Sequence, residues 1–381
     1  MKSDELTYLR AVRISIMGFA FQLVLALVLL LAVGAFAFVL SHTEECMPSN
    51  ESRVAEDGFT AVRYRCYGSP DVLEFVTQEH PELASGEILV RVKAAAVNPL
   101  DWHYMRGEPY FMRLGSGLGA PDDTRLGVDF AGVVEAVGPG VQRFTAGDRV
   151  FGAANGAFAE YVLASEDRPI VAIPEGVSFA DAAALPIAAV TALQALRDKG
   201  RLESGEKVLI NGASGGVGTF AVQIAKAMGA EVHGVCSTRN VELVRSLGAD
   251  RVYDYRNEDY TESEQAYDLI VDMVGNHSVG KNQRALKPDG RLVIVGGPKG
   301  NWIAPLIRPL GALLRSPFAS QEISVILARL RSEDLETLAA MVAAGEIDPV
   351  LDHSFPLREA ADAIRYSETG RARGKILIRM E

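Results

Sequence analysis

The chain begins with a long apolar stretch. Residues 14–40 include no charged side chain, and Ser15 and Gln22 are the only clearly polar ones. As a helix, this stretch would extend about 40 Å, which exceeds the roughly 30 Å hydrocarbon core of a bilayer. The pattern therefore predicts one N-terminal transmembrane helix over 14–40. A cleaved secretory signal, with a small-x-small site at Ala35–Ala37, and a buried helix of a soluble protein are the alternatives.

Four segments with different patterns follow this stretch. A polar segment over 41–59 predicts a linker. Over 60–185, short runs such as EILVRVKAAAVN and FAGVVEAVG are separated by Gly, Pro and Asp, which predicts a compact β-rich domain. Over 186–328, apolar runs alternate with helical patterns, which predicts a parallel sheet with helices on both faces. We expect 329–381, a helix, strand, helix, strand pattern, to return to the first domain.

The segment EKVLINGASGGVGTFAVQIAKAMGA contains the clearest binding motif. A strand pattern over 207–211 and a helical pattern over 217–228 flank the spacing Ala-x-Gly-x-x-Gly, a dinucleotide fingerprint with Ala in its first position. Small residues at these positions allow the backbone to approach a pyrophosphate at a helix N-terminus. The residues that we expect to bind a dinucleotide here are Ala213, Ser214, Gly215, Gly216, Val217 and Gly218.

The end of the following strand predicts which dinucleotide binds. NAD enzymes carry Asp or Glu there for the ribose hydroxyls. This chain reads GVCSTRN, with no acidic residue over 234–240 but with Ser237, Thr238 and Arg239. Hydroxyl donors and a guanidinium suit the 2′-phosphate of NADPH. We therefore expect NADPH as the cofactor, although Arg239 alone could instead be a solvated loop charge.

These motifs, together with AVNPLDWHYMRG and LGVDFAGVVEAVG, resemble the medium-chain dehydrogenase/reductase superfamily, and within it the zeta-crystallin-like quinone oxidoreductases. The resemblance covers about 60–381 and leaves out the apolar stretch and the linker. It implies an α/β fold in which a GroES-like, β-rich substrate domain is interrupted by a Rossmann domain, a doubly wound parallel sheet. The active site would lie in the cleft between the two domains.

The zinc-ligand positions of the metal-dependent relatives carry other residues in this chain. The two Cys and one His of that branch correspond to Asn98, Ile187 and Val128. Neither Val nor Ile offers a lone pair, and catalytic zinc needs three protein ligands. The four-cysteine structural loop is absent, and Leu100 replaces the hydroxyl that relays a proton in those relatives. We therefore expect no metal site.

The lack of a metal favours a conjugated acceptor as substrate. Reduction of a simple ketone needs an electrophile such as zinc, whereas a conjugated acceptor spreads the charge onto a distant oxygen that hydrogen-bond donors can stabilise. The resemblance agrees, because zinc-free relatives reduce quinones or α,β-unsaturated carbonyls with NADPH. The leading hypothesis is a membrane-anchored, zinc-independent NADPH-dependent quinone or enone reductase. An alcohol or aldehyde oxidoreductase and a non-catalytic NADPH-binding membrane protein are the alternatives.

The resemblance also assigns roles to side chains near the expected cleft. Asn98 matches the active-site Asn of the family, and His103 or Tyr104 falls where relatives place a Tyr over the nicotinamide. Tyr110 is a candidate wall of the substrate pocket. The alternative for these aromatic residues is that they only pack the loop. We expect Asp129 to hold its loop by accepting backbone hydrogen bonds.

Two further positions match cofactor contacts of the family. Thr191, in the helix that begins after Pro186, resembles a residue that contacts the nicotinamide. Tyr255 matches a Tyr that flanks the 2′-phosphate in NADPH-dependent relatives. Both are therefore expected to bind the cofactor.

Composition limits the choice of partners. The chain has 381 residues and a net charge of −11, which argues against a nucleic-acid surface. Cys46, Cys66 and Cys236 are far apart in the sequence and indicate neither a disulfide framework nor a structural zinc site. The expected partners are a small-molecule substrate and membrane lipid, and a homodimer remains open.

The charges around the apolar stretch bear on its orientation. Lys2, Arg10 and Arg13 precede it, whereas the next twenty residues contain five acids and Arg53 alone. The positive-inside rule then places the N-terminus in the cytoplasm and the rest of the chain outside. NADPH is a cytoplasmic metabolite and argues for the opposite side. The sequence thus predicts a single-pass membrane anchor and leaves the side of the catalytic domain undecided.

Overall fold

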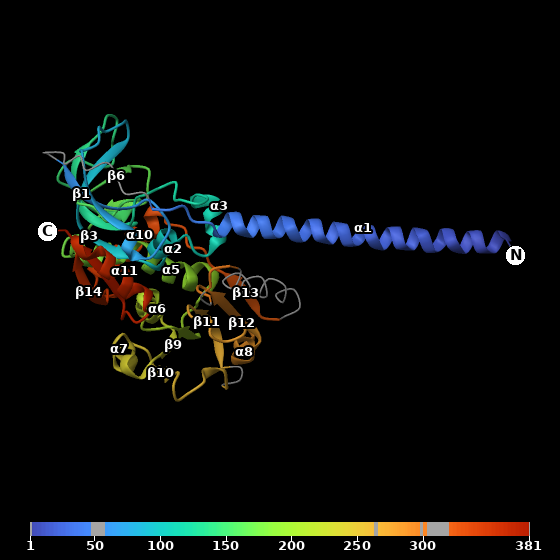
Figure 1. The fold of residues 1–381 in the computed structure, drawn as a ribbon. Helices are drawn as coiled ribbons and strands as arrows, with labels where there is room; N and C mark the ends of the chain where they lie inside the picture. The colour runs from blue at the N-terminus through green and yellow to red at the C-terminus, as the bar shows by residue number, and fades with distance from the viewer. Residues whose placement is uncertain (1, 47–57, 263–265, 298–299, 303–319, 381) are drawn as a thin grey trace.

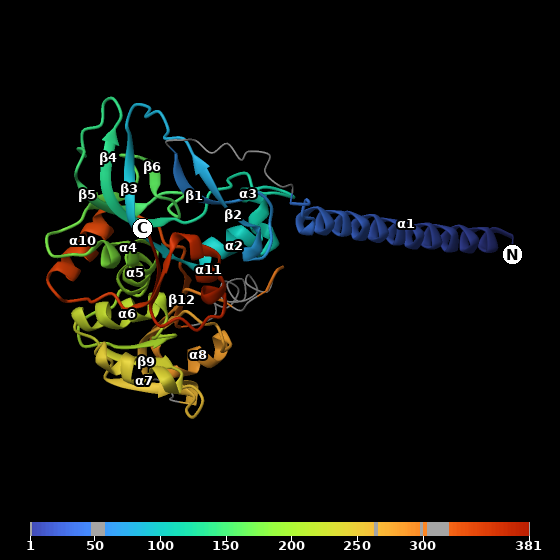
Figure 2. The same cartoon turned by 60° about the vertical axis from the view of Figure 1, so that its left-hand side comes forward.

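A computed structural model describes residues 2–46, 58–262, 266–297, 300–302 and 320–380 of the chain, with side chains from residue 22 onwards (Figure 1). A single long helix extends away from a compact body that contains two large β-sheets and a two-stranded one. The body places a mostly antiparallel sheet beside a parallel one, with helices packed between and around them (Figures 1 and 2).

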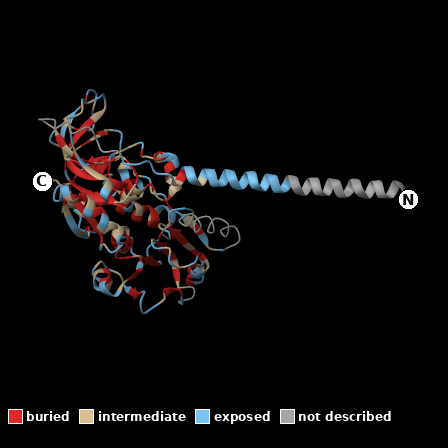
Figure 3. Ribbon diagram, viewed as in Figure 1, coloured by how far each residue is buried: buried red, intermediate tan, exposed pale blue. Residues whose placement is uncertain are grey.

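Helix α1 (Lys2–Ser41) includes the whole predicted apolar stretch and begins well before it. From Leu23 to Val39 its large apolar side chains are exposed, and the C-terminal end of the helix meets the body (Figure 3). This exposure contradicts the alternative of a buried core helix. The 20 residues Gln22–Ser41 are long and apolar enough to cross a membrane, and a signal sequence near an N-terminus would have the same properties.

The residues directly after α1 pack against the body. The guanidinium of Arg113, which is buried, donates from Nη1 to the carbonyl oxygens of Leu40 (3.2 Å) and His42 (2.8 Å). The amide of Glu44 donates to the carbonyl of Gly119 (3.0 Å). The first residues of the predicted linker are therefore fixed in place, and 47–57 lie outside the described residues.

Cys46 and Cys66 form a disulfide, with their Cα atoms 5.3 Å apart. Our expectation that the cysteines indicate no disulfide was therefore wrong for this pair. The bond joins the segment after α1 to the segment after β1 (Phe59–Tyr64), which turns back beside it. Sequence spacing could not reveal this approach, because it depends on how the β-rich domain folds. Cys236 is a buried free thiol.

The larger sheet combines strands from both ends of the body. Its order is β14-β15-β3-β4-β5-β7. Strand β6 pairs with the same edge of β3 as β15 does: β6 lies beside residues 87–91 and β15 beside residues 94–97. The C-terminal strands thus complete the sheet that the N-terminal strands begin, and β1 and β2 form a separate hairpin. The bounds are β2 (Leu73–Gln78), β3 (Glu87–Val97), β4 (Asp129–Val137), β5 (Arg149–Ala153), β6 (Tyr161–Ser165), β7 (Ile170–Ala172), β14 (Leu351–Pro356) and β15 (Lys375–Arg379).

The second sheet has the order β10-β9-β8-β11-β12-β13, and all its described neighbours are parallel. Its central strands are continuous apolar runs because helices cover both faces, and Val208, Leu209 and Ile210 are fully buried. In a doubly wound sheet a ligand binds at the carboxyl ends of the strands where the order reverses, here β8 and β11. The bounds are β8 (Lys207–Asn211), β9 (Glu231–Cys236), β10 (Arg251–Asp254), β11 (Tyr267–Asp272), β12 (Leu286–Ile294) and β13 (Glu322–Val325).

The helices of the body join the two sheets. The fingerprint helix α6 packs beside α5, which in turn contacts α10. Helix α2 follows β3 directly and contacts α11. The bounds are α2 (Pro99–Arg106), α3 (Arg113–Ser116), α4 (Phe179–Ala184), α5 (Pro186–Gln194), α6 (Gly216–Ala227), α7 (Val241–Ser246), α8 (Val279–Ala285), α10 (Ser332–Ala343) and α11 (Ala360–Glu368).

Candidate active site

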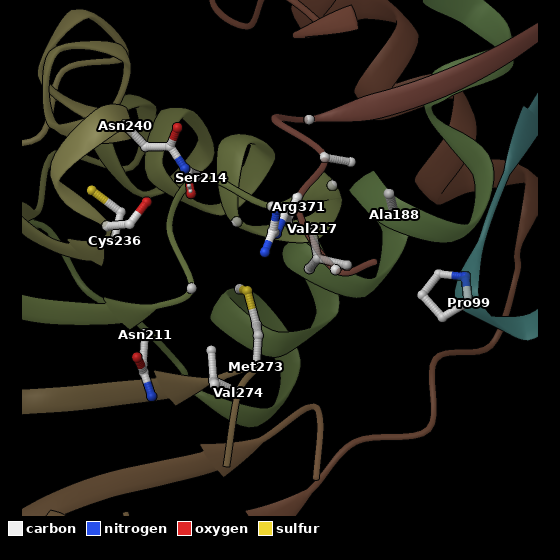
Figure 4. Close-up of a pocket in the computed structure, with 18 of the residues that line it drawn as sticks. Pro99, Ala188, Asn211, Ser214, Val217, Cys236, Asn240, Met273, Val274 and Arg371 are labelled. Carbon is white, nitrogen blue, oxygen red and sulfur yellow. Dashed lines mark hydrogen bonds between the residues drawn. The ribbon is translucent and has the colours of Figure 1, made fainter. Parts of the chain in front are cut away.

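A cavity of about 850 Å³ lies where the two sheets meet. Three parts of the chain line it: the end of β3, the loops at the carboxyl ends of the parallel strands, and the segment that leads into β15. Figure 4 shows Asn240, Ser214 and Cys236 on one side, and Ala188 and Pro99 on the other. Arg371 and Val217 lie between these two groups. The cavity therefore belongs to both domains.

The glycine-rich loop between β8 and α6 forms the middle of the cavity. Gly215, Gly216, Val217 and Gly218, which are among the expected cofactor-binding residues, line it. A Cβ atom on Gly218 would lie 2.1 Å from the carbonyl oxygen of Gly212, so only glycine allows this close turn. The first amides of α6 have no intrahelical acceptor and are available to an anion at this end of the helix. The loop therefore fits a pyrophosphate.

The two remaining fingerprint residues differ in position. Ser214 lines the cavity, and its Oγ accepts a hydrogen bond from Nδ2 of Asn240 (2.8 Å). Ala213 is fully buried beneath the loop and does not belong to the cavity wall. Asn240 is a wall residue that the sequence analysis missed, and its buried Oδ1 has no hydrogen-bond partner.

One end of the cavity is rich in arginine. Ser237, Arg239 and Tyr255, which are expected to bind the cofactor, line it together with Arg256 and Arg371. The latter two were not predicted, although the run RARGK at 371–375 indicates positive charge. This combination of guanidinium and hydroxyl groups is able to bind a phosphate.

The carboxylate at the end of β10 is already engaged. Thr238 points away from the cavity and donates to Asp254 Oδ2 (2.6 Å), and the side chain of Asn257 donates to the same oxygen (2.7 Å). The hydrogen bond from Thr238 is the main reason that the pKa of Asp254 lies below its usual value. Thr238 is therefore a support for this loop rather than part of the cavity wall.

A cluster of buried polar side chains occupies the opposite end. Asn98 caps α2: its amide donates to Asp101 Oδ2 (2.7 Å). Its side-chain Nδ2 donates to Asp129 Oδ2 (2.9 Å) and to the carbonyl of Ala96 (3.3 Å), and its Oδ1 accepts from Lys375 Nζ (2.6 Å). Asn98 and Lys375 both line the cavity. Asn98 therefore lies at the cavity, but both of its N–H donors are already bound.

The charged members of this cluster are almost completely buried. Asp129 Oδ2 lies 3.6 Å from Lys375 Nζ, and Asp129 Oδ1 accepts from the amide of Ile187 (3.2 Å), in line with its expected role in holding the loop. Burial is the largest influence on all three pKa values: it raises that of Asp129, raises that of Asp101 to about 7 and lowers that of Lys375. Oδ1 of Asp101 has no hydrogen-bond partner.

His103 and Tyr104 do not line the cavity. His103 Nδ1 contacts the carbonyl oxygen of Glu108 (2.6 Å), and burial lowers the pKa of the imidazole. Tyr104 is 38% exposed. The reason is the periodicity of α2, whose buried face contains Asp101 and Met105, so that the residues between them face away. The structure thus does not place an aromatic ring of α2 over the cavity.

Tyr110 and Thr191 also lie outside the cavity wall. The ring of Tyr110 packs edge-on against Trp302, with 4.8 Å between the ring centroids. The hydroxyl of Thr191 donates to the carbonyl of Ile187 one turn earlier (2.6 Å) and is therefore occupied within α5. Contact of either residue with a substrate or cofactor stays a prediction.

Comparisons with known proteins agree with this architecture. Residues 84–175 match the family model for the alcohol dehydrogenase GroES-like domain, and 247–378 match that for zinc-binding dehydrogenases. The chain is 34% identical over 335 residues to the chloroplast envelope quinone oxidoreductase homolog of Arabidopsis thaliana. This match covers 84% of this chain and 97% of that protein. It is 33% identical over 332 residues to 2-methylene-furan-3-one reductase of Solanum lycopersicum, and this match covers 83% of this chain and 77% of that protein.

A solved structure shows the same fold. The quinone oxidoreductase from Coxiella burnetii has a TM-score of 0.75 and 30% sequence identity, covering 85% of this chain and 100% of that one. The expected fold class, a GroES-like domain interrupted by a Rossmann-type parallel sheet, is therefore confirmed. Membership also implies a nicotinamide cofactor, and the glycine-rich loop fits one. The chain belongs to the medium-chain dehydrogenase/reductase superfamily and is a homologue of its quinone oxidoreductases.

Proposed function

We propose that this protein is a zinc-independent, NADPH-dependent reductase of quinones or α,β-unsaturated carbonyls, held at a membrane by α1. The observation that carries the proposal is the cavity between the domains. It joins an arginine-rich end, a glycine-rich loop and a buried polar cluster in one continuous space. These three parts suit the phosphate, the pyrophosphate and the reacting end of the cofactor with its acceptor.

The choice of NADPH over NADH rests on the arginine-rich end. Arg239, Arg256 and Arg371 line it together with Ser237. Asp254, the carboxylate at the end of β10, is bound by Thr238 and Asn257. A 2′-phosphate therefore meets several donors. The ribose hydroxyls of NADH find no acidic residue over 234–240, at the end of β9, and no free carboxylate at the end of β10.

Independence from zinc rests on the residues at the three ligand positions. Although one matching family model is described as zinc-binding, Val128 and Ile187 offer no ligand atom. The third position, Asn98, is committed to Asp129 and Lys375. Within the described part of the chain, no group of three His, Cys, Asp or Glu side chains could hold a metal ion.

The acceptor class is supported by the relatives. Two of them are named as quinone oxidoreductases or their homologues, and the tomato enzyme is named for a ketone with a conjugated methylene group. Association with a membrane is supported by the apolar exposed surface of α1 and by the envelope location in the name of the Arabidopsis relative. A lipid-soluble quinone would then meet the enzyme at the bilayer.

A direct assay tests the proposal. The full chain is purified in detergent and its NADPH oxidation is followed with a panel of quinones, enals and saturated aldehydes, while bound zinc is measured by elemental analysis. We expect quinones or enals to be reduced much faster than aldehydes, with less than one zinc per ten chains. One zinc per chain that a chelator removes together with activity would contradict the proposal, and so would a preference for saturated aldehydes.

A further inference from the structure

Lys375 enters the cavity from a distant part of the chain. It is the first residue of β15, and the amide of Gly374 before it donates to the carbonyl of Ser214 in the glycine-rich loop (3.0 Å). A Cβ atom on Gly216 would lie 3.4 Å from Cδ of Lys375, so the lysine stem passes directly beside the loop. The residue lines the cavity, and its side chain is 3% exposed.

The ammonium group of Lys375 has one short hydrogen bond. Nζ lies 2.6 Å from Asn98 Oδ1, 3.4 Å from the carbonyl oxygen of Val97 and 3.6 Å from Asp129 Oδ2. Strong N–H···O bonds span 2.7–3.2 Å, and an ammonium group carries three donors. Two of the three N–H groups are therefore bound weakly and remain able to donate to a ligand.

This cation lies among the positions that bind zinc in the metal-dependent relatives. Asn98 stands at one ligand position, and Asp129 directly follows Val128 at the second. Asp129 also accepts the amide hydrogen bond of Ile187 at the third. Lys375 Nζ lies 2.6 Å from Asn98 Oδ1 and 3.6 Å from Asp129 Oδ2. A positive charge thus occupies the region from which zinc would polarise a substrate oxygen.

Asn98 cannot take this role itself. Its two N–H groups are bound to Ala96 and Asp129, and its oxygen faces the ammonium. Its side chain therefore orients Lys375 rather than donating to a substrate. The ion pair with Asp129 offsets the cost of burying the ammonium, because an unpaired buried charge would be strongly destabilising.

We propose that Lys375 is the hydrogen-bond donor for the acceptor oxygen in this enzyme. This assignment rests on the proposed function. The acceptor takes up a hydride, two electrons and one hydrogen nucleus, from the reduced nicotinamide at one end of its conjugated system. Negative charge collects on the carbonyl oxygen at the other end, where the Lys375 ammonium stabilises it. One proton from water then completes the product, so that each acceptor gains one hydride and one proton.

The test needs variants that keep the buried site electrically balanced. Lys375→Met preserves the length of the side chain but leaves Asp129 unpaired, so it could fail to fold. The double variant Lys375→Met/Asp129→Asn removes both charges, and the wild type, which keeps both, is the reference. Lys281→Met, on the exposed face of α8, is the matched surface control. Each protein is used as the full chain in detergent.

The decisive measurement compares two acceptors of nearly equal size, 2-methyl- and 2-chloro-1,4-benzoquinone. The methyl quinone is the poorer acceptor, so more charge has developed on its oxygen at the transition state. Relative to the wild type, we expect the double variant to lose about 100- to 1000-fold in kcat with the methyl quinone. We expect the loss to be at least about fivefold smaller with the chloro quinone. The Kd for NADPH, measured by fluorescence, should change by less than about threefold.

Each outcome has a distinct meaning. An equal loss with both quinones, or a loss confined to the Kd for NADPH, would show that Lys375 only holds the two domains together and would overturn the assignment. Full activity of the double variant would overturn it as well. If the wild-type chain reduces neither quinone nor any enal, the proposed function itself fails. An active wild type with a uniform loss rejects only the role of Lys375.

Discussion

Arg239 shares the arginine-rich end of the cavity with Arg256 and Arg371, and its Nη2 donates to the backbone carbonyl of Arg371. The residue therefore connects the parallel-sheet domain to the C-terminal segment as well as facing the cavity. A test of Arg239 must therefore distinguish binding of the cofactor phosphate from the structural contact with Arg371. NADPH and NADH, which differ by one phosphate, allow this distinction.

We expect Arg239→Ala to weaken NADPH binding about 10- to 150-fold, because a charge-assisted contact to a phosphate is worth roughly 1.5–3 kcal/mol. Binding of NADH, which lacks the phosphate, should stay nearly unchanged. Titrations that follow cofactor fluorescence at one fixed salt concentration check this. Arg245→Ala, an exposed arginine on α7, is the control. Equal losses for both cofactors would mean that the contact with Arg371 is the only role of Arg239.

Asp101 predicts a pH dependence of stability. Burial raises its pKa to about 7 in the folded chain, well above the value of about 4 in an unfolded one. Between these values the folded state holds a proton that the unfolded state has released. The contribution of Asp101 to stability is therefore complete below about pH 4 and is lost as the pH rises through 7.

Asp101→Asn should remove this dependence, because an amide does not titrate and its oxygen still accepts the amide hydrogen bond of Asn98. We expect the free energy of unfolding of the wild type to fall relative to that of the variant between pH 4 and pH 7.5. Urea unfolding at several pH values measures the difference. Asp122→Asn, an exposed acid on a neighbouring loop, should leave the profile unchanged. Parallel profiles for the wild type and Asp101→Asn would show that Asp101 ionises normally.

At the scale of elements, the sequence predicted what short-range patterns determine. The strand over 207–211, the helix that follows it and the glycine loop between them are contiguous, and their residue types alone favour that geometry. Lys375 and Arg371 could not be placed in the same way, because they reach the loop from a segment more than a hundred residues later. The sequence could not show that His103 and Tyr104 lie outside the cavity wall, because packing determines which face of α2 is buried.

The disulfide between Cys46 and Cys66 is an element-scale contact of this long-range kind. The two cysteines are separated by 20 residues, and the bond closes the segment between α1 and the end of β1. Closing a loop of this size restricts the unfolded chain and stabilises the folded one by about 3 kcal/mol in the chain-entropy view. The bond should therefore contribute measurably to the stability of the body.

We expect the double variant Cys46→Ser/Cys66→Ser to lower the free energy of unfolding by about 2–4 kcal/mol. A thiol reductant should lower the stability of the wild type by a similar amount. The same reductant should not affect the double variant, which serves as the control, since buried Cys236 remains unpaired in both. Urea unfolding with and without reductant makes the comparison. An unchanged midpoint in all four conditions would show that the two cysteines are not bonded in solution.

At the scale of the whole molecule, α1 and the body form a connected unit. Arg113 donates to the carbonyls of Leu40, in the last turn of α1, and of His42, just after it. It also donates to the carbonyl of Gly107 at the end of α2 (2.8 Å). The guanidinium lies 4.4 Å from the ring centroid of Tyr67. These contacts of Arg113 thus join the end of the apolar helix to the body.

A chain that starts at Leu40 should therefore leave the membrane fraction and keep its Kd for NADPH within about twofold, because it retains every contact of Arg113. A chain that starts at Arg53 loses the carbonyls of Leu40 and His42 and the partner of Cys66. We expect it to unfold at a lower urea concentration. Sedimentation of membranes followed by cofactor titration measures both effects. If the chain from Leu40 stays in the membrane fraction, α1 is not the anchor.

The pairing of β15 with β3 has a consequence for how the chain is made. The carbonyl of Val97 in β3 and Nζ of Lys375 in β15 are separated by 278 positions in the sequence. At about 5–20 residues per second, a ribosome needs roughly 15–55 s to cover that distance. During this time β3 exists with one stretch of its edge unpaired, and an open strand edge invites pairing with other chains. We therefore expect the chain to be open to aggregation while it is being translated, and a chaperone that shields β3 should reduce that aggregation.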